Sequence, residues 1–194
     1  MSGPKSGPGP IRFAAARGTV MGMNTTTPTG QLNVSVAIVT GASRGLGAAL
    51  ARGLAAQGWR LVIDARTGHE LAGTAQELAA LTDVVALPGD ITDDNHRREL
   101  ATAAEDLGGA RLLVNNASIL GGSPPPLLAD IPMAVLLDTF AVNVFAPVAL
   151  TQRVLPQLRR VPGTCVPACT RRRTRARTSP TGRRRKRWYR PFST

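Results

Sequence analysis

The chain of 194 residues is long enough for one domain with its own hydrophobic core, and its formal net charge of +12 raises the question of a nucleic-acid partner. All 12 acidic residues lie between Asp64 and Asp138, whereas 13 of the 24 basic residues lie between Arg159 and Arg190. Residues 1–158 carry a net charge of −1, so the basic excess belongs to the tail and does not assign the rest of the chain to nucleic acid.

The two cysteines, Cys165 and Cys169, also lie in the tail and have no companion pair. They indicate neither a disulfide framework nor a metal site, and we expect no bound metal. No apolar run has the length of a membrane span, and the N-terminus lacks the apolar core of a secretory signal. These features predict a soluble, cytoplasmic protein without a membrane span.

The chain divides into three regions by composition. Residues 1–32 are predicted to be disordered because they are rich in Gly-Pro pairs and threonine, and the basic tail 161–194 is also expected to be disordered. In residues 33–160, the predicted strands cover 34–40, 59–65, 83–87 and 111–115, and the predicted helices cover 45–57, 68–81, 93–107 and 131–158. This alternation predicts a Rossmann-like, doubly wound α/β fold with a parallel sheet in the order 3-2-1-4, truncated after about four strands.

A glycine-rich turn connects the first predicted strand to the first predicted helix. It reads Thr40-Gly-Ala-Ser-Arg-Gly-Leu-Gly47. Glycines let the backbone approach a pyrophosphate closely, and the helix N-terminus offers free N–H groups to it. The residues expected to contact a dinucleotide here are Thr40, Gly41, Ser43, Arg44, Gly45, Leu46 and Gly47. The alternative is a tight strand-to-helix turn that binds no ligand.

Three further motifs follow in chain order. They are Gly89-Asp90-Ile91-Thr92, Asn115-Asn116-Ala117-Ser118, and Asn143 within Val-Asn-Val-Phe-Ala-Pro. With the glycine turn, they resemble the short-chain dehydrogenase/reductase family over residues 34–158. In that family the Asn-Asn-Ala motif ends in glycine, where this chain has Ser118.

The resemblance implies a role for each motif. Asp90 would hold the adenine amino group with Ile91 beside it, and Asn116 and Ala117 would also contact the cofactor. Asn143 would be a catalytic residue that supports a water in the proton relay. Each motif has a structural alternative: Asp90 as a helix cap, the paired asparagines as a tie between loops, and Asn143 as a buried amide.

The end of the second predicted strand bears on the choice of cofactor. Family members selective for NAD carry an acidic residue at the position of Ala65, where it binds the ribose hydroxyls. Asp64 lies one residue earlier, which turns its side chain to the other face of the strand. Arg44 and Arg66 suit a 2′-phosphate better than a diol, so NADP(H) is favoured and NAD(H) is the alternative. That alternative requires solvated arginines and an Asp64 that still reaches the ribose.

The two histidines, His69 and His96, are expected on helix surfaces rather than in a catalytic site. The family's chemistry requires a serine on a fifth strand and a Tyr-x-x-x-Lys segment, in which lysine lowers the tyrosine pKa. No fifth strand is evident after Gly163, and the only tyrosine, Tyr189, has no lysine four residues later. The chain as written is therefore expected to be inactive, and the strand 111–115 is expected to be an exposed, aggregation-prone edge.

The composition of the tail suggests a GC-rich gene read out of frame. In a shifted frame, the codons of residues 179–188 permit a Tyr-x-x-x-Lys segment, and those of residues 166–168 permit a pair of serines. A frameshift would thus have replaced the catalytic half. The alternatives are a non-catalytic nucleotide-binding protein, or nucleic-acid binding through the Arg-rich tail, although no specific nucleic acid is expected. By resemblance, the substrate is a small alcohol or carbonyl compound and the protein is a homo-oligomer with an incomplete interface.

Overall fold

The computed structural model describes residues 9, 11–14, 35–122, 126–160 and 164–167. Six strands form one sheet in the order β1-β4-β3-β2-β5-β6. The strands are β1 Ile11–Phe13, β2 Val36–Val39, β3 Arg60–Ala65, β4 Val84–Pro88, β5 Ala110–Asn115 and β6 Thr164–Pro167. The helices are α1 Gly45–Ala56, α2 Gly68–Ala79, α3 Asp94–Asp106, the 3₁₀ turn Leu128–Asp130, α4 Met133–Phe140, the π-helical segment Ala141–Phe145 and α5 Ala146–Arg160.

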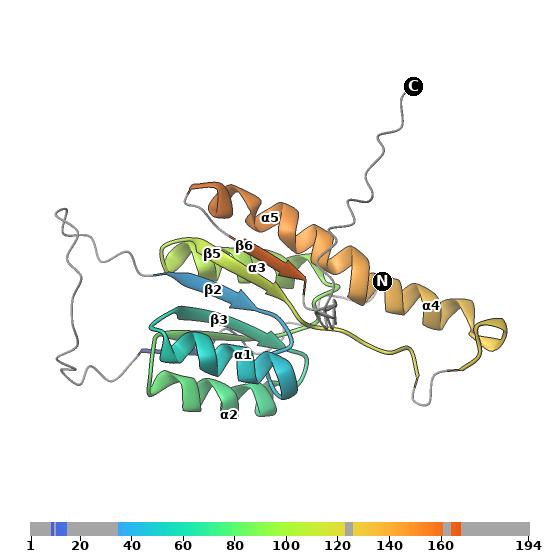
Figure 1. Cartoon of the computed structure of the whole chain (residues 1–194), viewed down its shortest axis with the longest axis horizontal. Coiled ribbons are helices and arrows are strands. Elements are labelled where there is room, and N and C mark those ends of the chain that lie inside the picture. The colour runs from blue at the N-terminus through green and yellow to red at the C-terminus, as the bar shows by residue number, and fades with distance from the viewer. Residues whose placement is uncertain (1–8, 10, 15–34, 123–125, 161–163, 168–194) are drawn as a thin grey trace, which may run out of the picture.

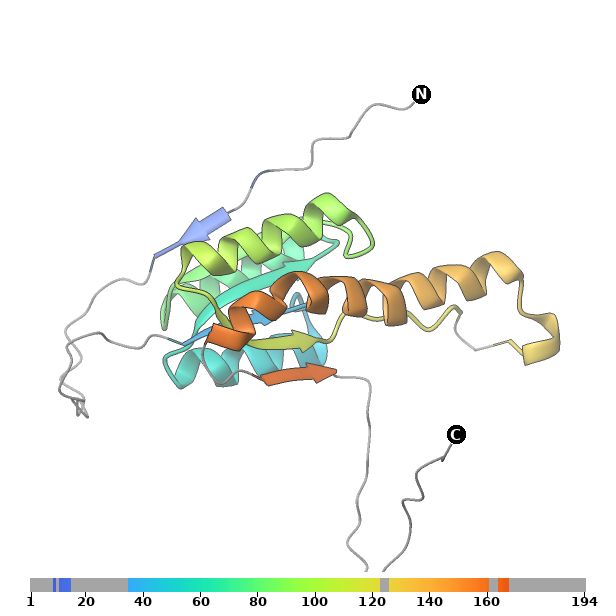
Figure 2. The ribbon, with the colours of Figure 1, turned by 90° about the horizontal axis from the view of Figure 1, so that it is seen from above.

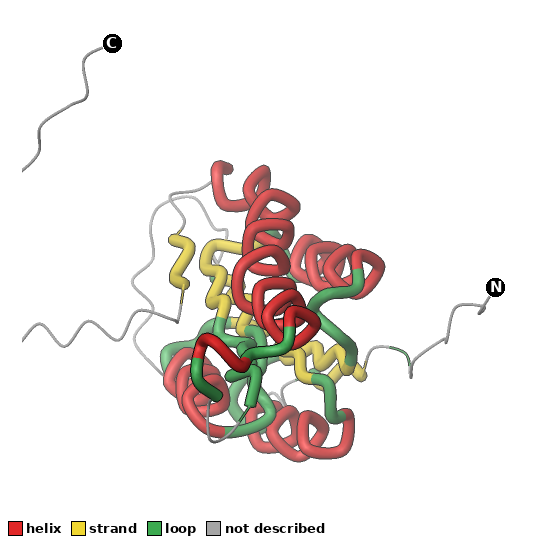
Figure 3. The backbone as a smooth tube through the Cα atoms, turned by 90° about the vertical axis from the view of Figure 1, so that its right-hand side faces the viewer, coloured by secondary structure: helices red, strands yellow, loops and turns green. Residues whose placement is uncertain are grey.

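Helices cover both faces of the sheet, as Figure 3 shows end-on. Helices α1 and α2 pack on one face, where Val39, Ile63 and Leu71 belong to the core. Helices α3 and α5 pack on the other, where Leu100 and Leu150 belong to the core. Burial on both faces explains why the central strands are continuous β-branched and leucine runs rather than alternating ones.

The four predicted strands correspond to β2, β3, β4 and β5, which pair in parallel in the predicted order. This confirms the Rossmann-like, doubly wound fold. All the crossovers between them are helical, so their carboxyl ends lie at one edge of the sheet, on the right in Figure 1. The glycine turn and the loops after β3, β4 and β5 therefore meet at that edge.

Two strands lie where none was predicted. Residues Thr164–Pro167 form β6, which pairs in parallel with β5, and Ile11–Phe13 forms β1, which pairs antiparallel with β4. The expectations that no fifth strand follows and that the strand at 111–115 is an exposed edge are therefore wrong (Figure 2). Four-residue and three-residue strands satisfy open sheet edges but carry too little periodicity to stand out in a sequence. The remaining parts of 1–32 and 161–194 lie outside the described residues.

The last predicted helix is one helical stretch, Met133–Arg160, of 28 residues. It continues through Pro147 and Pro156, and its α4 end projects beyond the sheet (Figures 1 and 2). By length and composition alone it could cross a membrane, so the statement that no apolar run has that length is wrong. The α5 end packs on α3 and β5, whereas only 11% of the most apolar window of the helical stretch is buried. One such helix is weak evidence for a membrane span.

A buried glutamine joins this helix to the sheet. The Gln157 side chain accepts the Ala110 N–H at 2.8 Å and donates to the Ala101 carbonyl oxygen at 2.8 Å. It therefore satisfies one backbone group of β5 and one of α3 in a region that water does not reach. These two bonds fix where α5 lies relative to the sheet.

Candidate cofactor-binding site

The glycine turn has a conformation and a packing density that require glycine. Gly41 and Gly45 have positive φ angles of 66° and 59°. A Cβ on Gly47 would lie 2.3 Å from the Gly41 carbonyl oxygen, and one on Gly41 would lie 2.9 Å from the Ala117 Cα. The first turn of α1 is therefore pressed against the end of β2 and the loop after β5.

Thr40 and Asn116 tie this turn to the loop after β5. The Thr40 hydroxyl accepts the N–H groups of Asn116 and Ala117 at 2.9 and 3.0 Å. The Asn116 amide donates to the Thr40 and Gly41 carbonyl oxygens at 2.9 and 3.0 Å. The interpretation that this asparagine ties loops together therefore describes its contacts in the structure. It shapes the floor of the site and leaves Ala117 facing the cleft.

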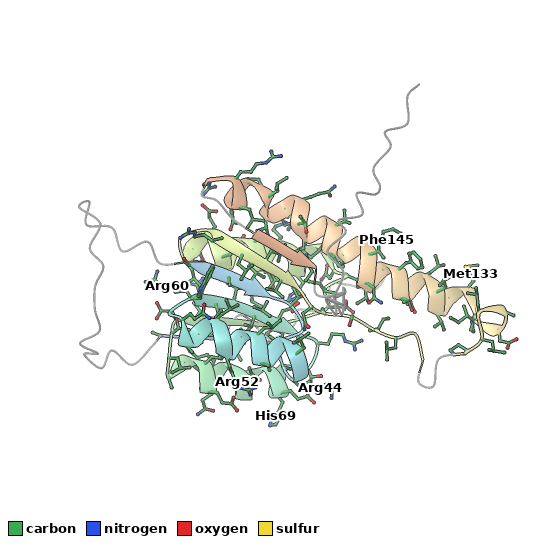
Figure 4. All side chains as sticks on the ribbon, viewed as in Figure 1. Arg44, Arg52, Arg60, His69, Met133 and Phe145 are labelled. Atoms are coloured by element: carbon green, nitrogen blue, oxygen red, sulfur yellow. The ribbon has the colours of Figure 1, made fainter. Side chains whose placement is uncertain are left out.

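Asp64 lines the cleft beside Ala65, and its carboxylate is held by two neighbouring groups. Its side chain is 2% exposed, and its carboxylate accepts the Gly41 N–H at 2.7 Å. The other carboxylate oxygen lies 3.1 Å from Nε2 of His96, which is itself 4% exposed. The prediction that His96 lies on a helix surface is therefore wrong. His69 is exposed on α2, as predicted (Figure 4).

The burial of His96 has a signal in the sequence. It lies one turn before Leu100 and two turns before Ala104, both of which are buried in α3. That spacing places His96 on the apolar face of the helix. The approach of Asp64 from β3 supplies the polar partner that makes the burial of the His96 ring possible.

Two arginines lie at the outer end of the cleft. Arg44, labelled in Figure 4, has a side chain that is 84% exposed, and its nearest carboxylate is Glu70 at 3.9 Å. Arg66 follows β3 and is exposed, while Ala65 beside it is 8% exposed. Glu70 also accepts a hydrogen bond from the Ser43 hydroxyl at 3.3 Å. Sequence reasoning missed Glu70, which becomes part of the site only because α2 packs beside α1.

Asp90 lies in the loop after β4. Its carboxylate accepts the Thr92 N–H and the Thr92 hydroxyl, both at 2.8 Å. Desolvation raises the pKa of Asp90, but the Thr92 hydrogen bonds and the charge of Arg66 outweigh it, so the pKa lies below its ordinary value. The alternative role of Asp90 as a helix cap is wrong, because the N-cap of α3 is Asp93. Asp90 is therefore ionised and exposed at the cleft.

Asn143 lies on the π-helical segment Ala141–Phe145. Its amide donates to the Ile119 carbonyl oxygen at 2.8 Å and accepts the Ile119 N–H at 2.9 Å. These paired bonds hold the chain after Ser118 against the long helix. Asn143 is half-buried, and it lies where the helical stretch is π-helical, a local irregularity that is often found at functional sites.

These elements form one cleft of about 270 Å³ at the carboxyl edge of the sheet. Of the residues predicted to bind cofactor, those that line it are Gly41, Ser43, Arg44, Arg66, Asp90, Ile91, Asn116 and Ala117. The predicted site residues that lie outside this lining are Thr40, Gly45, Leu46, Gly47 and Asn143. The lining residues that sequence reasoning missed include Thr67, Glu70 and Val142.

The sequence model of a family described as short chain dehydrogenase matches residues 35–170. The chain belongs to this family. The matched region begins just before β2 and includes β6, so it spans the parallel part of the sheet and the whole cleft.

Characterised members of the short chain dehydrogenase family are similar over about two thirds of this chain. A 1-deoxy-11-beta-hydroxypentalenate dehydrogenase from Streptomyces avermitilis is 40% identical over 129 residues, which are 66% of this chain and 47% of that protein. A rhamnolipids biosynthesis 3-oxoacyl-[acyl-carrier-protein] reductase from Pseudomonas aeruginosa is 39% identical over 127 residues, 64% of this chain and 48% of that protein. The chain therefore spans about half the length of the curated relatives it matches.

Solved structures agree with this fold. The RhlG/NADP active-site complex from Pseudomonas aeruginosa has a TM-score of 0.59 and 35% identity, over 70% of this chain and 52% of that one. An alcohol dehydrogenase from the archaeon Thermococcus sibiricus, complexed with 5-hydroxy-NADP, has a TM-score of 0.62 and 27% identity, over 68% of this chain and 56% of that one. Both similarities cover the part of the chain that carries the cleft.

Proposed function

We propose that this chain binds a nicotinamide dinucleotide in the cleft. The observation that carries the proposal is the N-terminus of α1, where Arg44 makes no side-chain cap and the first turn contains no acidic residue. The N–H groups of that turn are available to a phosphate, and the helix dipole favours an anion there. Helix α3 differs, because Asp93 caps it and Asp94 lies in its first turn.

NADP(H) is the cofactor that the charges of the cleft favour. The Asp64 side chain is 2% exposed and its two oxygens face Gly41 and His96, an arrangement that disfavours contacts with the ribose hydroxyls. Arg44 and Arg66 remain beside the neutral Ala65 and would pair with a 2′-phosphate. Two of the solved relatives carry NADP or a modified NADP, which supports the same choice.

Other residues of the cleft would orient the rest of the molecule. Asp90 is ionised and would accept a hydrogen bond from the adenine amino group, with Ile91 beside it. Asn116 holds the floor of the cleft, and Asn143 fixes the loop that begins at Ser118. When bound, the nicotinamide would supply a hydride to a substrate or accept one from it.

We propose that this chain does not itself interconvert an alcohol and a carbonyl compound. The proposal rests on the sequence, in which Asn143 is the one catalytic residue of the family pattern and Tyr189 lacks its lysine. Without an acid to protonate the substrate oxygen, hydride transfer loses its proton partner. A frameshift in the gene would explain the loss, and β6 contains the first position at which the shifted frame permits serine.

Cofactor binding is tested by titrating the full chain with NADPH and with NADH, following nicotinamide fluorescence. We expect tighter binding of NADPH, and a loss of about tenfold or more for NADPH alone in Arg44→Ala/Arg66→Ala, because each lost Arg–phosphate contact is a charge-assisted bond. Arg52→Ala is the control, since Arg52 lies on α1 and pairs with Glu77 outside the cleft. Equal affinities for the two cofactors, unchanged in the double variant, would reject NADP(H) selectivity.

Catalysis is tested with the same preparation. NADPH oxidation with a panel of ketones and 3-oxoacyl thioesters is expected to stay at the level of the buffer. Sequencing the gene should reveal Ser and Tyr-x-x-x-Lys in the shifted frame, and their absence there would refute a frameshift. Robust turnover by the 194-residue chain would contradict the proposed inactivity. NADPH binding without turnover would leave a non-catalytic nucleotide-binding protein as the function.

We also propose that the chain self-associates through the long helix. Its exposed apolar side chains are Met133, Leu137, Phe140, Val144, Phe145 and Val148. Met133 and Phe145 are labelled on the projecting end in Figure 4. An apolar surface of this kind favours burial against a partner.

A further inference from the structure

Asp64 bonds the glycine turn through both its main chain and its side chain. The carboxylate accepts the Gly41 N–H at 2.7 Å, and the Asp64 carbonyl oxygen accepts the Ala42 N–H at 2.8 Å. Two consecutive amides of the turn are therefore fixed by one residue of β3. Since Gly41 has a positive φ, its N–H direction sets the course of the chain into α1.

His96 holds the carboxylate in this position. Its Nε2 lies 3.1 Å from the second oxygen of Asp64, and both side chains are at least nine-tenths buried. An ionised carboxylate only accepts hydrogen bonds, so we assign the proton between them to Nε2 of the histidine. With Gly41 on one oxygen and His96 on the other, each carboxylate oxygen has a donor.

Gly89 makes room for the histidine ring. A Cβ at this position would lie 2.3 Å from Nδ1 of His96, so replacing Gly89 by any other amino acid would displace the ring. The Gly89 N–H donates to the Ala65 carbonyl oxygen at 3.0 Å, which joins the ends of β4 and β3. The ring of His96 is therefore wedged between α3 and the loop that leads to Asp90.

We infer that Asp64 and His96 are positioning residues for cofactor binding, which act as a buried clamp on the phosphate-binding turn. His96 orients Asp64, and Asp64 holds Gly41 and Ala42 so that the N–H groups at the start of α1 point into the cleft. Neither side chain needs to touch the cofactor. The inference rests on the proposed cofactor function and adds to it the device that keeps the turn preorganised in the empty protein.

The variant His96→Leu removes the donor, and His96→Gln keeps a donor at the position of Nε2. We expect the affinity of the full chain for NADPH to fall about tenfold in His96→Leu, as for the loss of one buried hydrogen bond, and to be largely restored in His96→Gln. Leu100→Ala is the matched control, because Leu100 is fully buried one turn later in α3. It should lower the melting temperature without a comparable loss of NADPH affinity.

A second measurement tests the hydrogen bond between the Gly41 N–H and the Asp64 carboxylate in the absence of cofactor. The Gly41 amide proton, bonded to a carboxylate, should resonate far downfield in the ¹H–¹⁵N spectrum of the free protein. It should move upfield in His96→Leu and stay in His96→Gln and Leu100→Ala. If His96→Leu does not fold, Asp64→Asn takes its place, since the amide can still accept from Gly41 and donate to the histidine, and the clamp predicts retained NADPH binding.

The outcomes separate the two proposals. Failure of the wild-type chain to bind NADPH would refute the proposed function. The chemical shift of the Gly41 amide proton in the variants would still test whether His96 holds Asp64 against the turn. An unmoved Gly41 signal together with unchanged NADPH affinity in His96→Leu would overturn the clamp. Asp64→Leu removes both side-chain contacts, and the clamp predicts that it lowers NADPH affinity. A loss of affinity in Asp64→Asn as large as that in Asp64→Leu would also overturn the clamp, because it would show that the hydrogen bonds do not position the turn.

Discussion

Gly47→Ala is the substitution for which the structure gives the clearest expected cost. A Cβ there would lie 2.3 Å from the Gly41 carbonyl oxygen and 2.5 Å from the Asn116 amide nitrogen, and the nearer of these atoms is backbone. Relief requires α1 to move away from β2 or the Asn116 amide to leave its two carbonyl partners. Overpacking costs about 1–3 kcal/mol, and the loss of both Asn116 hydrogen bonds would add about 2 kcal/mol, so we expect a loss of about 1–5 kcal/mol in the free energy of unfolding, depending on which group moves.

The same helix supplies the control. Gly53 lies six residues later in α1, and a Cβ there would meet nothing within 4 Å. Gly53→Ala should therefore stabilise the protein by about 0.5–1 kcal/mol, the ordinary helix preference of alanine over glycine. Urea unfolding followed by circular dichroism measures both variants. If Gly47→Ala were as stable as Gly53→Ala, the tight approach of α1 to the β2 end would be refuted.

Four further outcomes are expected. Replacing Gln157 by Leu should lower the free energy of unfolding by about 1–3 kcal/mol, because it leaves two buried backbone groups without partners; urea unfolding measures it, and an unchanged midpoint contradicts the reasoning. The folded-state pKa of Asp90 is lowered, so its carboxylate stabilises the fold above its unfolded pKa, and this stabilisation is lost as pH falls through the folded value. Asp90→Asn should therefore make the unfolding midpoint less dependent on pH below about pH 4, and identical acid profiles of the variant and the original chain would argue against this. Deleting residues 1–14 removes β1 and opens the β4 edge, so light scattering should show faster aggregation than for the full chain, and equal rates would show that β1 does not protect the edge. Phe145→Glu should shift the protein toward monomer in size-exclusion chromatography, and an unchanged elution volume would exclude the exposed helix face as the contact.

The corrected sheet edges change the expectation for solubility. The sequence predicts an exposed, aggregation-prone edge at residues 111–115, which lie in β5. In the structure β6 pairs with β5 and β1 pairs with β4, so the outer strands are only four and three residues long. Short edge strands are one of the ways in which proteins limit edge-to-edge aggregation. The apolar side chains that remain exposed include those on one helical stretch, Met133–Arg160.

The features that depend on residues close together in the chain could be predicted from the sequence. The glycine turn, the β-branched strands and the amphipathic helices each depend on residues near one another in the chain, and their alternation is enough to order the parallel strands. The cleft lining at Gly41, Arg44, Arg66 and Asp90 follows from that order, because it places the ends of these strands at one edge.

Only the tertiary structure could decide the partners of individual polar groups. Asp64 and His96 are 32 residues apart, and the helical spacing that places His96 on the apolar face of α3 does not show which carboxylate it meets there. The same holds for β1 and β6, which exist as strands because an open edge of the sheet is there to receive them. Short-range periodicity and the glycine turn were enough to predict the parallel α/β core and the likeness to the family. The structure decided which polar groups are buried, because burial depends on partners that arrive from distant parts of the chain.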